Sequence, residues 1–367
     1  MSGGLRAVAL IASAQWMAVP QVPATTPDGF AIARPGYRFS FPRDHGAHPE
    51  FRTEWWYFTG HLWSLDGKRR FGYQLTFFRQ ASPKLAYTGS AAWRSDQIFL
   101  AHGTLTDAAG QRFLVSERLN RGGLVANAAA DHLALFNESW KAEQEVSGVI
   151  RLHLSVQGAI LDLAMQAPSL PVIFGEDGVS RKGADPRASS HYLTFPRLPS
   201  TGTLALSNEA PIPVSGTTWM DHEFSSNQLG TDQVGWDWAG IQLRDGRSLM
   251  VYRMRKNDGS QDPFSIIYEV DKTGQITRRT RDFKITEQGA WTSPASGTRY
   301  PQPLVFEAWG ERFNLVPLLQ DQELRTVRST GITYWEGACR VVDKSGQEIG
   351  DAYLEQTGYA HSLKGRF

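Results

Sequence analysis

The chain has 367 residues, which is long for one domain and suits two. Its 38 basic and 37 acidic side chains leave a formal net charge of +1, so it lacks the positive field that holds nucleic acid. Hydrophobic residues make up 41% and charged residues 20%, which excludes a disordered chain. Twelve Trp, 11 Tyr and 19 Phe, with 35 Gly and 19 Pro, favour short strands and tight turns over a helical bundle.

The N-terminus predicts export. Arg6 precedes an apolar run over residues 7–14, and Val22-Pro23-Ala24 fits a small-residue cleavage site. We therefore expect residues 1–24 to be a signal peptide and the mature chain to begin near Thr25, in the periplasm or secreted. A disordered cytoplasmic tail is the alternative, because one arginine is a weak start for a signal. No later run approaches the roughly 20 apolar residues of a membrane helix, so no integral membrane segment is expected in the mature chain.

Hydrophobic residues alternate with period two over residues 71–77, 150–156 and 161–165, which is typical of strands buried on one face. Asp-Gly, Gly-Gly, Thr-Gly and Ser-Gly turn signals separate the runs. Only residues 139–146 fit a helical turn or two. The pattern predicts an all-β antiparallel meander, with no barrel strand before Pro35.

An internal repeat indicates two related β domains. Each copy has a Trp, a Gly four residues later, an Asp-Gly turn and a Tyr seven residues after that Asp: Trp56, Gly60, Asp66 and Tyr73, then Trp236, Gly240, Asp245 and Tyr252. The second copy is one residue shorter before its turn, and chance matching of common turn residues is the alternative explanation. The repeat places the boundary near Gly230-Thr231, giving domains 25–230 and 231–367, with the Pro-rich stretch 196–213 as the rival boundary.

A long meander must protect its edge strands, and two closed barrels do this most simply. A barrel of eight to ten strands has room for its own side chains and one small ligand. Cys339 is the only cysteine, which excludes an intrachain disulfide and a Cys-based metal cluster.

Three clusters combine acidic or histidine side chains with Trp and Tyr, a composition typical of a ligand pocket. They contain Glu54, Trp56 and Tyr57; Trp219, Asp221, His222 and Glu223 with Trp236, Asp237 and Trp238; and Tyr334, Trp335 and Glu336. A carboxylate among tryptophans has a raised pKa unless it is paired, as an acid catalyst requires. The alternatives are ordinary core packing for the tryptophans and pairing with arginine for the carboxylates.

Strand geometry divides the central cluster. Asp221 and Glu223 share a strand face with Trp219, whereas His222 points to the opposite face. This argues against a metal triad, and no zinc-binding His pair, nucleotide-binding glycine motif or Gly-x-Ser-x-Gly motif occurs. We therefore expect neither a metal nor another cofactor.

Taken together, the Trp-rich motifs resemble the AttH/CrtC-like lipocalin family. They lie at residues 54–60, 219–225, 235–238, 291–301, 334–338 and 357–360. The resemblance covers nearly everything from Phe41 to Ala360. It implies two tandem lipocalin-like (calycin) antiparallel barrels, export, and a gene placed beside an ABC transporter.

The family includes carotenoid 1,2-hydratases, which protonate an isolated double bond and add water. Of the hydratase pattern, His222 and Tyr252 are present, but Phe224 stands where tryptophan is expected and Met254 where the proton-donating aspartate is expected. A hydratase would then need another acid, Asp221 or Asp237. The AttH branch is the closer likeness.

We expect a protein that binds an apolar ligand, isoprenoid or acyl, between or within the barrels and works beside an ABC transporter. The alternative is a carotenoid 1,2-hydratase-like hydro-lyase, in which tryptophan faces stabilise a carbocation and a carboxylate supplies the proton. Asp221, His222, Asp237 and Tyr252 would then be catalytic, with Asp221 the leading candidate. The other residues of the three clusters would bind the ligand: Glu54, Trp56, Tyr57, Trp219, Glu223, Trp236, Trp238, Tyr334, Trp335 and Glu336.

Overall fold

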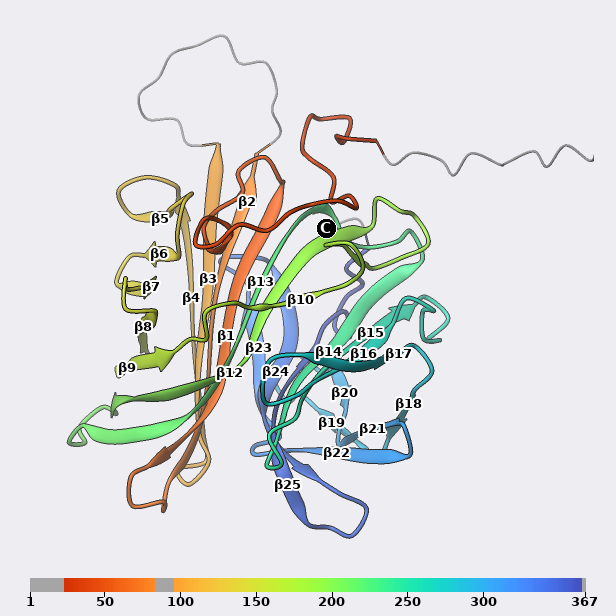
Figure 1. Ribbon diagram of the computed structural model, residues 1–367. Coiled ribbons are helices and arrows are strands. Elements are labelled where there is room, and N and C mark those ends of the chain that lie inside the picture. Colours follow the sequence, from red (N-terminus) through yellow and green to blue (C-terminus); the bar gives the residue numbers. More distant parts are fainter. Residues whose placement is uncertain (1–22, 83–95, 365–367) are drawn as a thin grey trace, which may run out of the picture.

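The structure is a computed structural model and describes residues 23–82 and 96–364. Within these residues the protein consists of strands, with one short 3-10 turn at Arg43–His45 and no α-helix, so the predicted all-β class is confirmed (Figure 1). The predicted signal peptide lies outside the described residues except for its last two positions. Between residues 23 and 35 there is one isolated bridge, from Thr25 to Ala31, and no strand, as predicted.

The first sheet contains all the strands before residue 228. These are β1 (Thr53–Ser64), β2 (Arg70–Ala81), β3 (Gln97–Asp107), β4 (Arg112–Arg121), β5 (Ala126–Ala128), β6 (Ala134–Asn137), β7 (Trp140–Gln144), β8 (Val149–Val156), β9 (Ala159–Gln166), β10 (Val172–Phe174), β11 (Ser180–Arg181), β12 (Ser189–Ala205) and β13 (Ile212–Asn227). Their order is β4-β3-β2-β1-β13-β12-β9-β8-β7-β6-β5, with β10 and β11 also paired to β12.

The second sheet and a small hairpin follow. The strands are β14 (Gln233–Leu243), β15 (Ser248–Lys256), β16 (Ile266–Val270), β17 (Ile276–Thr280), β18 (Lys284–Glu287), β19 (Ala290–Thr292), β20 (Arg299–Pro301), β21 (Leu304–Ala308), β22 (Glu311–Pro317), β23 (Glu323–Thr326), β24 (Ile332–Val342) and β25 (Glu348–Gln356). The order is β17-β16-β15-β14-β25-β24-β22-β21-β18, with β23 on β24, and β19 pairs with β20 alone. The chain crosses between the sheets over residues 228–232, which contain Gly230-Thr231, whereas residues 196–213 lie within the β12–β13 hairpin.

Each sheet curls around its own apolar core to form a lipocalin-like barrel unit. In the first unit, β4 and β5 are not joined by backbone pairing within the described residues. Side chains close the gap instead: Arg118 Nη1 donates to the carbonyl oxygen of Asn137 at 2.6 Å, and Gly103 lies against Leu154 and Trp140. The predicted barrels are therefore nearly closed rather than sealed by a continuous ladder.

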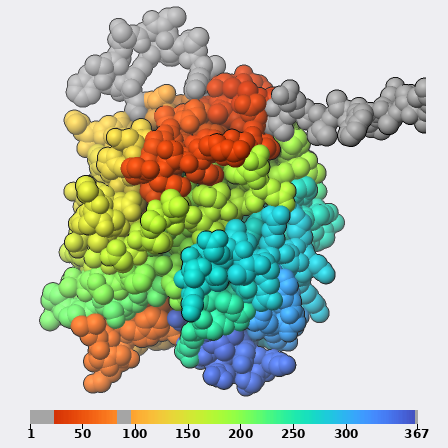
Figure 2. Space-filling model, in the orientation of Figure 1, coloured from red at the N-terminus to blue at the C-terminus, as the bar shows by residue number. Residues whose placement is uncertain are grey.

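The two barrel units pack directly against each other (Figure 2). A third apolar cluster, separate from the two barrel cores, lies where β1 and β13 of the first sheet face β14, β15 and β25 of the second. Across this contact His61 Nε2 hydrogen-bonds the carbonyl oxygen of Ala352 at 2.9 Å. Strands β1 and β2 are consequently buried on both faces, which explains why polar residues such as Gln74 and Thr76 are also buried.

Both copies of the sequence repeat form hairpins, β1–β2 and β14–β15, with their turns at Asp66-Gly67 and Asp245-Gly246 as predicted. The glycines have φ of +70° and +96°, which residues with a Cβ rarely adopt. Trp56 pairs with Phe77 and Trp236 with Met254. The repeat tyrosines differ: Tyr73 pairs with Gly60, whereas Tyr252 pairs with Trp238, two positions before the repeat glycine. One position comes from the shorter second copy and the other from a pairing about the turn that differs by one residue.

The helical expectation for residues 139–146 was wrong. Trp140–Gln144 forms β7, in which Trp140 and Ala142 are buried while Lys141 and Glu143 are exposed. The alternation of buried and exposed side chains favours a strand over a helix here. Trp140 packs in the first core and donates through Nε1 to the carbonyl oxygen of Ser155 at 2.8 Å.

Gly72 tests the close packing of the two sheets. A Cβ at this β2 position would collide with the Cβ of Ala338 on β24. We expect Gly72→Ala to lower the free energy of unfolding by about 1–3 kcal/mol, the usual cost of overpacking. Gly183→Ala is the control, since its Cβ would meet Ala188 at an ordinary 3.4 Å. Urea unfolding measures both, and equal effects would contradict tight packing at Gly72.

Candidate functional site

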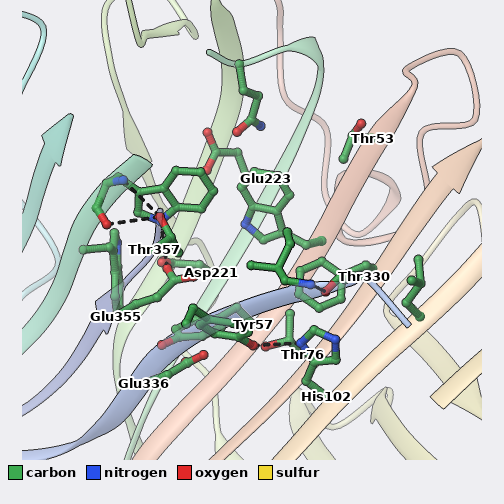
Figure 3. A pocket seen from close by; sticks show the side chains of 18 of the residues that line it. Thr53, Tyr57, Thr76, His102, Asp221, Glu223, Thr330, Glu336, Glu355 and Thr357 are labelled. Carbon is green, nitrogen blue, oxygen red and sulfur yellow. Dashed lines mark hydrogen bonds between the residues drawn. The ribbon is translucent and has the colours of Figure 1, made fainter. Parts of the chain in front are cut away.

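A cavity of about 120 Å³ lies between the two sheets, outside both barrel cores. Strands β1, β2, β3, β12 and β13 line it from one side and β14, β15, β24 and β25 from the other. Figure 3 shows Asp221, Glu223, Glu336 and Glu355 entering it together with Tyr57. Carboxyl groups and aromatic rings from distant parts of the chain therefore line one cavity.

Eight of the residues singled out in the sequence line this cavity. They are Tyr57, Asp221, Glu223, Trp236, Trp238, Tyr252, Tyr334 and Glu336. Period-two alternation explains the grouping within each strand: Asp221 and Glu223 face the cavity from β13, and Trp236 and Trp238 from β14. Trp219 lies just behind, where its Nε1 donates to Asp221 Oδ1 at 2.7 Å.

The other singled-out residues point away from the cavity. His222, Glu54 and Trp56 face the interior of the first barrel, where Trp56 stacks on His222 with ring centroids 4.7 Å apart. Trp335 lies in the second core and donates to the carbonyl oxygen of Gln320 at 2.7 Å.

Asp237 is a buried ion-pair partner. Its carboxylate lies 3.2 Å from Arg253 Nη1 and 3.4 Å from Arg255 Nε, and Tyr359 donates to it at 3.0 Å. Strand alternation turns it away from the face shared by Trp236 and Trp238. Of the four candidate catalytic residues, the cavity thus brings together Asp221 and Tyr252.

Asp221 is the best-defined acid in the cavity. Tyr192 donates to its Oδ2 at 2.6 Å, Trp219 donates to its Oδ1, and Trp238 Nε1 donates to the Tyr192 hydroxyl at 3.1 Å. Burial raises the pKa of Asp221 to about 7, although these hydrogen bonds favour the ionised form. At neutral pH the group can therefore both give and accept a proton.

Glu223, two residues along, is held by an ion pair. Lys182 Nζ lies 2.7 Å from Glu223 Oε1, and Ser190 also donates to this oxygen. The same ammonium lies over the rings of Tyr252 and Tyr192, 4.3 and 4.8 Å from their centroids. This cation fixes Glu223 and Tyr252 in place beside Asp221.

A second pair of carboxyl groups lies on the facing sheet. Glu336 and Glu355 are register partners on β24 and β25, and Trp236 Nε1 donates to Glu355 Oε2 at 3.0 Å. Burial and its acidic neighbours raise the pKa of Glu355 to about 7, and burial together with Glu355 raises the pKa of Glu336 well above its usual value. Two carboxylates this close share protons more readily than they share charge.

A chain of hydrogen bonds leads from the cavity to the surface. Tyr334 Oη lies 2.7 Å from His102 Nδ1, His102 Nε2 lies 2.9 Å from Ser329 Oγ, and Ser329 donates to Glu117 Oε2 at 2.5 Å. Burial lowers the pKa of His102 to about 3, so its ring is neutral. Figure 3 labels His102 and draws as a dashed line the hydrogen bond that its ring makes in the cavity.

Sequence reasoning missed several residues of this site: Trp55, Phe78, His102, Lys182, Tyr192 and Glu355. Trp55 could have been predicted from strand periodicity, because it lies two positions from Tyr57 on the same strand face. Glu355 lies just before the Thr357-Gly358-Tyr359 motif but has no local signal of its own. His102 and Lys182 have none either: His102 meets Tyr334 through the packing of the two sheets, and the segment after β11 brings Lys182 to Glu223 within the first unit.

The buried cluster of His48, Glu54 and His222 has the residue types of a metal site, with ligand atoms within 4.8 Å of one another. Both rings instead hydrogen-bond Glu54 Oε1, at 2.7 and 2.8 Å, and Arg79 Nε occupies Glu54 Oε2 at 2.8 Å. A guanidinium cation on the same carboxylate opposes a metal cation there. The donor set thus fits a hydrogen-bonded ion-pair cluster better than a metal centre.

The fold and cavity define a protein of two lipocalin-like barrel units with an acidic, aromatic site between them. The chain belongs to the AttH-like family, whose model matches residues 32–359. A crystal structure assigned to AttH from Nitrosomonas europaea is similar over 90% of this chain and 100% of that chain, with 32% identity and a TM-score of 0.80. No curated protein matches the sequence.

Two further crystal structures share the fold at 13% identity. Kievitone hydratase from Nectria haematococca covers 92% of this chain and 96% of its own, with a TM-score of 0.65. CghA with Sch210972 covers 92% of this chain and 98% of its own, with a TM-score of 0.54. Among the described residues, no helix has the length and apolar character needed to span a membrane.

Proposed function

We propose that this protein is an enzyme that adds water to, or removes it from, a carbon–carbon double bond of an apolar molecule held between the two barrel units. The observation that carries the proposal is Asp221, a cavity carboxyl with a pKa of about 7, surrounded by aromatic rings and oriented by Tyr192 and Trp219. A group with this pKa suits general acid–base catalysis at neutral pH. The fold shared with kievitone hydratase supports the same reaction class.

The size of the cavity limits what it encloses. Its volume of about 120 Å³ is slightly below the roughly 150 Å³ cavity that accommodates benzene in another protein. Trp55, Phe78, Trp236 and Trp238 supply apolar walls. In this conformation the site therefore holds a group of about six carbon atoms, such as an isoprenoid end or one ring of a larger molecule.

A second candidate is a binding protein that delivers an isoprenoid or acyl ligand to an ABC transporter after export. The apolar lining of the cavity supports this role as well, and it requires no proton transfer. Native mass spectrometry of protein purified from its host, read for a copurified lipid, favours the carrier if a whole ligand is found unchanged.

The enzyme proposal is tested with Asp221→Asn. Wild type is incubated with a panel of apolar alkenes, enones and prenylated phenols, and mass spectrometry detects gain or loss of one water. For a compound that reacts, we expect Asp221→Asn to lower turnover about a hundredfold or more, with little change in ligand affinity. Asp162→Asn, at an exposed carboxylate on β9, is the control with unchanged turnover. Equal turnover in wild type and Asp221→Asn would overturn the role of Asp221.

A further inference from the structure

Two polar groups in the cavity have no hydrogen-bond partner among the described residues. They are the hydroxyl of Tyr57 on β1 and Oε1 of Glu336 on β24, whose residues are only 7% and 1% exposed. Both line the cavity, and Figure 3 shows them in the same part of it. Leaving a buried polar group unpaired costs about 1–3 kcal/mol, so such groups call for a functional explanation.

The hydrogen-bond chain behind them fixes which protons are available. Ser329 donates its proton to Glu117, so Ser329 Oγ accepts from His102 Nε2–H. His102 is neutral, and its Nδ1 therefore lacks a proton and accepts from the hydroxyl of Tyr334. Tyr334 has no second proton to give. The Tyr57 hydroxyl interacts with the Glu336 carboxyl beside it but has no acceptor at hydrogen-bond distance among the described residues, so its proton is available to a ligand.

Glu336 is the second donor. Burial and the neighbouring Glu355 raise its pKa well above its usual value, which favours the protonated form that can donate. Burial and the Glu336 carboxyl raise the pKa of Tyr57 well above its usual value, so this hydroxyl also keeps its proton. With Glu336 in its protonated form, the pair presents two neutral O–H groups, an arrangement that stabilises an oxygen on which negative charge develops.

We propose that Tyr57 and Glu336 together bind the oxygen of a carbonyl group conjugated to the reacting double bond, so that the substrate class is the α,β-unsaturated carbonyl compounds. This inference rests on the proposed function, which it narrows from any apolar alkene to an enone. It also separates this chain from the hydration of an isolated double bond, where no oxygen on the substrate needs to be held.

In the hydration reaction, Asp221 transfers the protons, while Tyr57 and Glu336 hold the carbonyl oxygen. The ionised form of Asp221 takes a proton from water while the water oxygen forms a bond to the β-carbon. The electron pair of the double bond forms a new double bond to the carbonyl carbon, and the carbonyl π pair moves onto the oxygen, which Tyr57 and Glu336 hold as an enolate. Asp221 then returns its proton to the α-carbon, the carbonyl reforms, and one water has been added.

The binding half of the proposal is tested with 4-nitrophenol, whose phenolate oxygen resembles the enolate and whose single ring suits the cavity. Calorimetry and the phenolate absorbance measure binding. We expect Tyr57→Phe and Glu336→Leu each to weaken binding about tenfold or more, because each removes one donor. Glu336→Gln should retain most of the affinity, since its amide still donates. Tyr353→Phe is the control with unchanged affinity: its hydroxyl pairs with Thr104 and lies outside the cavity lining.

Absence of 4-nitrophenol binding to folded wild type would overturn the inference, as would unchanged affinity in Tyr57→Phe. Tighter binding of benzylammonium than of 4-nitrophenol would overturn it too, because it would show an ionised Glu336 that accepts from a cation.

Asp221→Asn distinguishes this inference from the proposed function. It should abolish hydration of 2-cyclohexen-1-one and leave 4-nitrophenol binding intact. Turnover only of isolated alkenes would leave the role of Asp221 in place and refute the oxygen-binding pair.

Discussion

Replacing Glu54 by glutamine is expected to lower the free energy of unfolding by about 3–5 kcal/mol, the cost of breaking a buried ion pair from one side. Glu54 is fully buried inside the first barrel. Its carboxylate accepts from Arg79 Nε at 2.8 Å and from the backbone amide of His48 at 2.9 Å, and both His48 and His222 bond its Oε1. A glutamine leaves the Arg79 charge without its counter-ion and places an amide where acceptors are needed.

The pH dependence gives this prediction a second readout. Arginine and histidine neighbours hold the pKa of Glu54 well below its usual value despite its burial, so its stabilising effect is present above pH 4.5 and is lost as pH falls toward the folded pKa. The variant should lack this acid-dependent loss. Glu209→Gln is the matched control, because Glu209 pairs with Arg69 and Arg112 at the surface, where such pairs contribute about 0–1 kcal/mol. A loss below 1 kcal/mol for Glu54→Gln in urea unfolding would contradict the cluster.

The first strand shows how far sequence reasoning reached. The motif around Glu54 identified a segment of functional interest, and strand periodicity correctly separates Glu54 and Trp56 from Trp55 and Tyr57. Periodicity does not say which of the two faces meets a ligand, because β1 is buried on both sides. Glu54 and Trp56 face the barrel interior and Trp55 and Tyr57 the cavity only because the second unit covers the outside of the first.

The cavity depends on contacts that no local pattern encodes. Glu355 becomes part of the site because β25 pairs with both β14 and β24, which brings it beside Trp236 and Glu336. His102 reaches Tyr334 across 232 positions of sequence. The resemblance gave the fold, and turn chemistry gave both repeat hairpins, but the register of Tyr252 also depends on how β14 and β15 pair about their turn, which no local pattern specifies.

The stability of wild type relative to Asp221→Asn is expected to fall as pH rises, by about 3 kcal/mol between pH 5 and 8. Burial raises the pKa of Asp221 from 3.8 to about 7. Below pH 4 both the folded and the unfolded chain bind this proton. Between pH 4 and 7 the folded chain keeps it while the unfolded chain releases it, so stability decreases through this interval and levels off above it.

Other titrating groups also make the free energy of unfolding depend on pH, in wild type and in Asp221→Asn alike. Subtracting the free energy of one protein from that of the other removes most of their contribution. Glu355 does not cancel fully, because Asp221 contributes to its raised pKa, and this adds to the fall in the same direction. Urea unfolding at half-unit pH steps measures the difference, and Asp162→Asn should show none of this slope because its carboxylate is exposed. A difference between wild type and Asp221→Asn that stays flat from pH 5 to 8 would mean that Asp221 is ionised throughout that range. Ionised Asp221 could still act as the base in enone hydration, but it could not protonate an isolated double bond, and the acid for that reaction would have to be Glu355, whose pKa is also about 7.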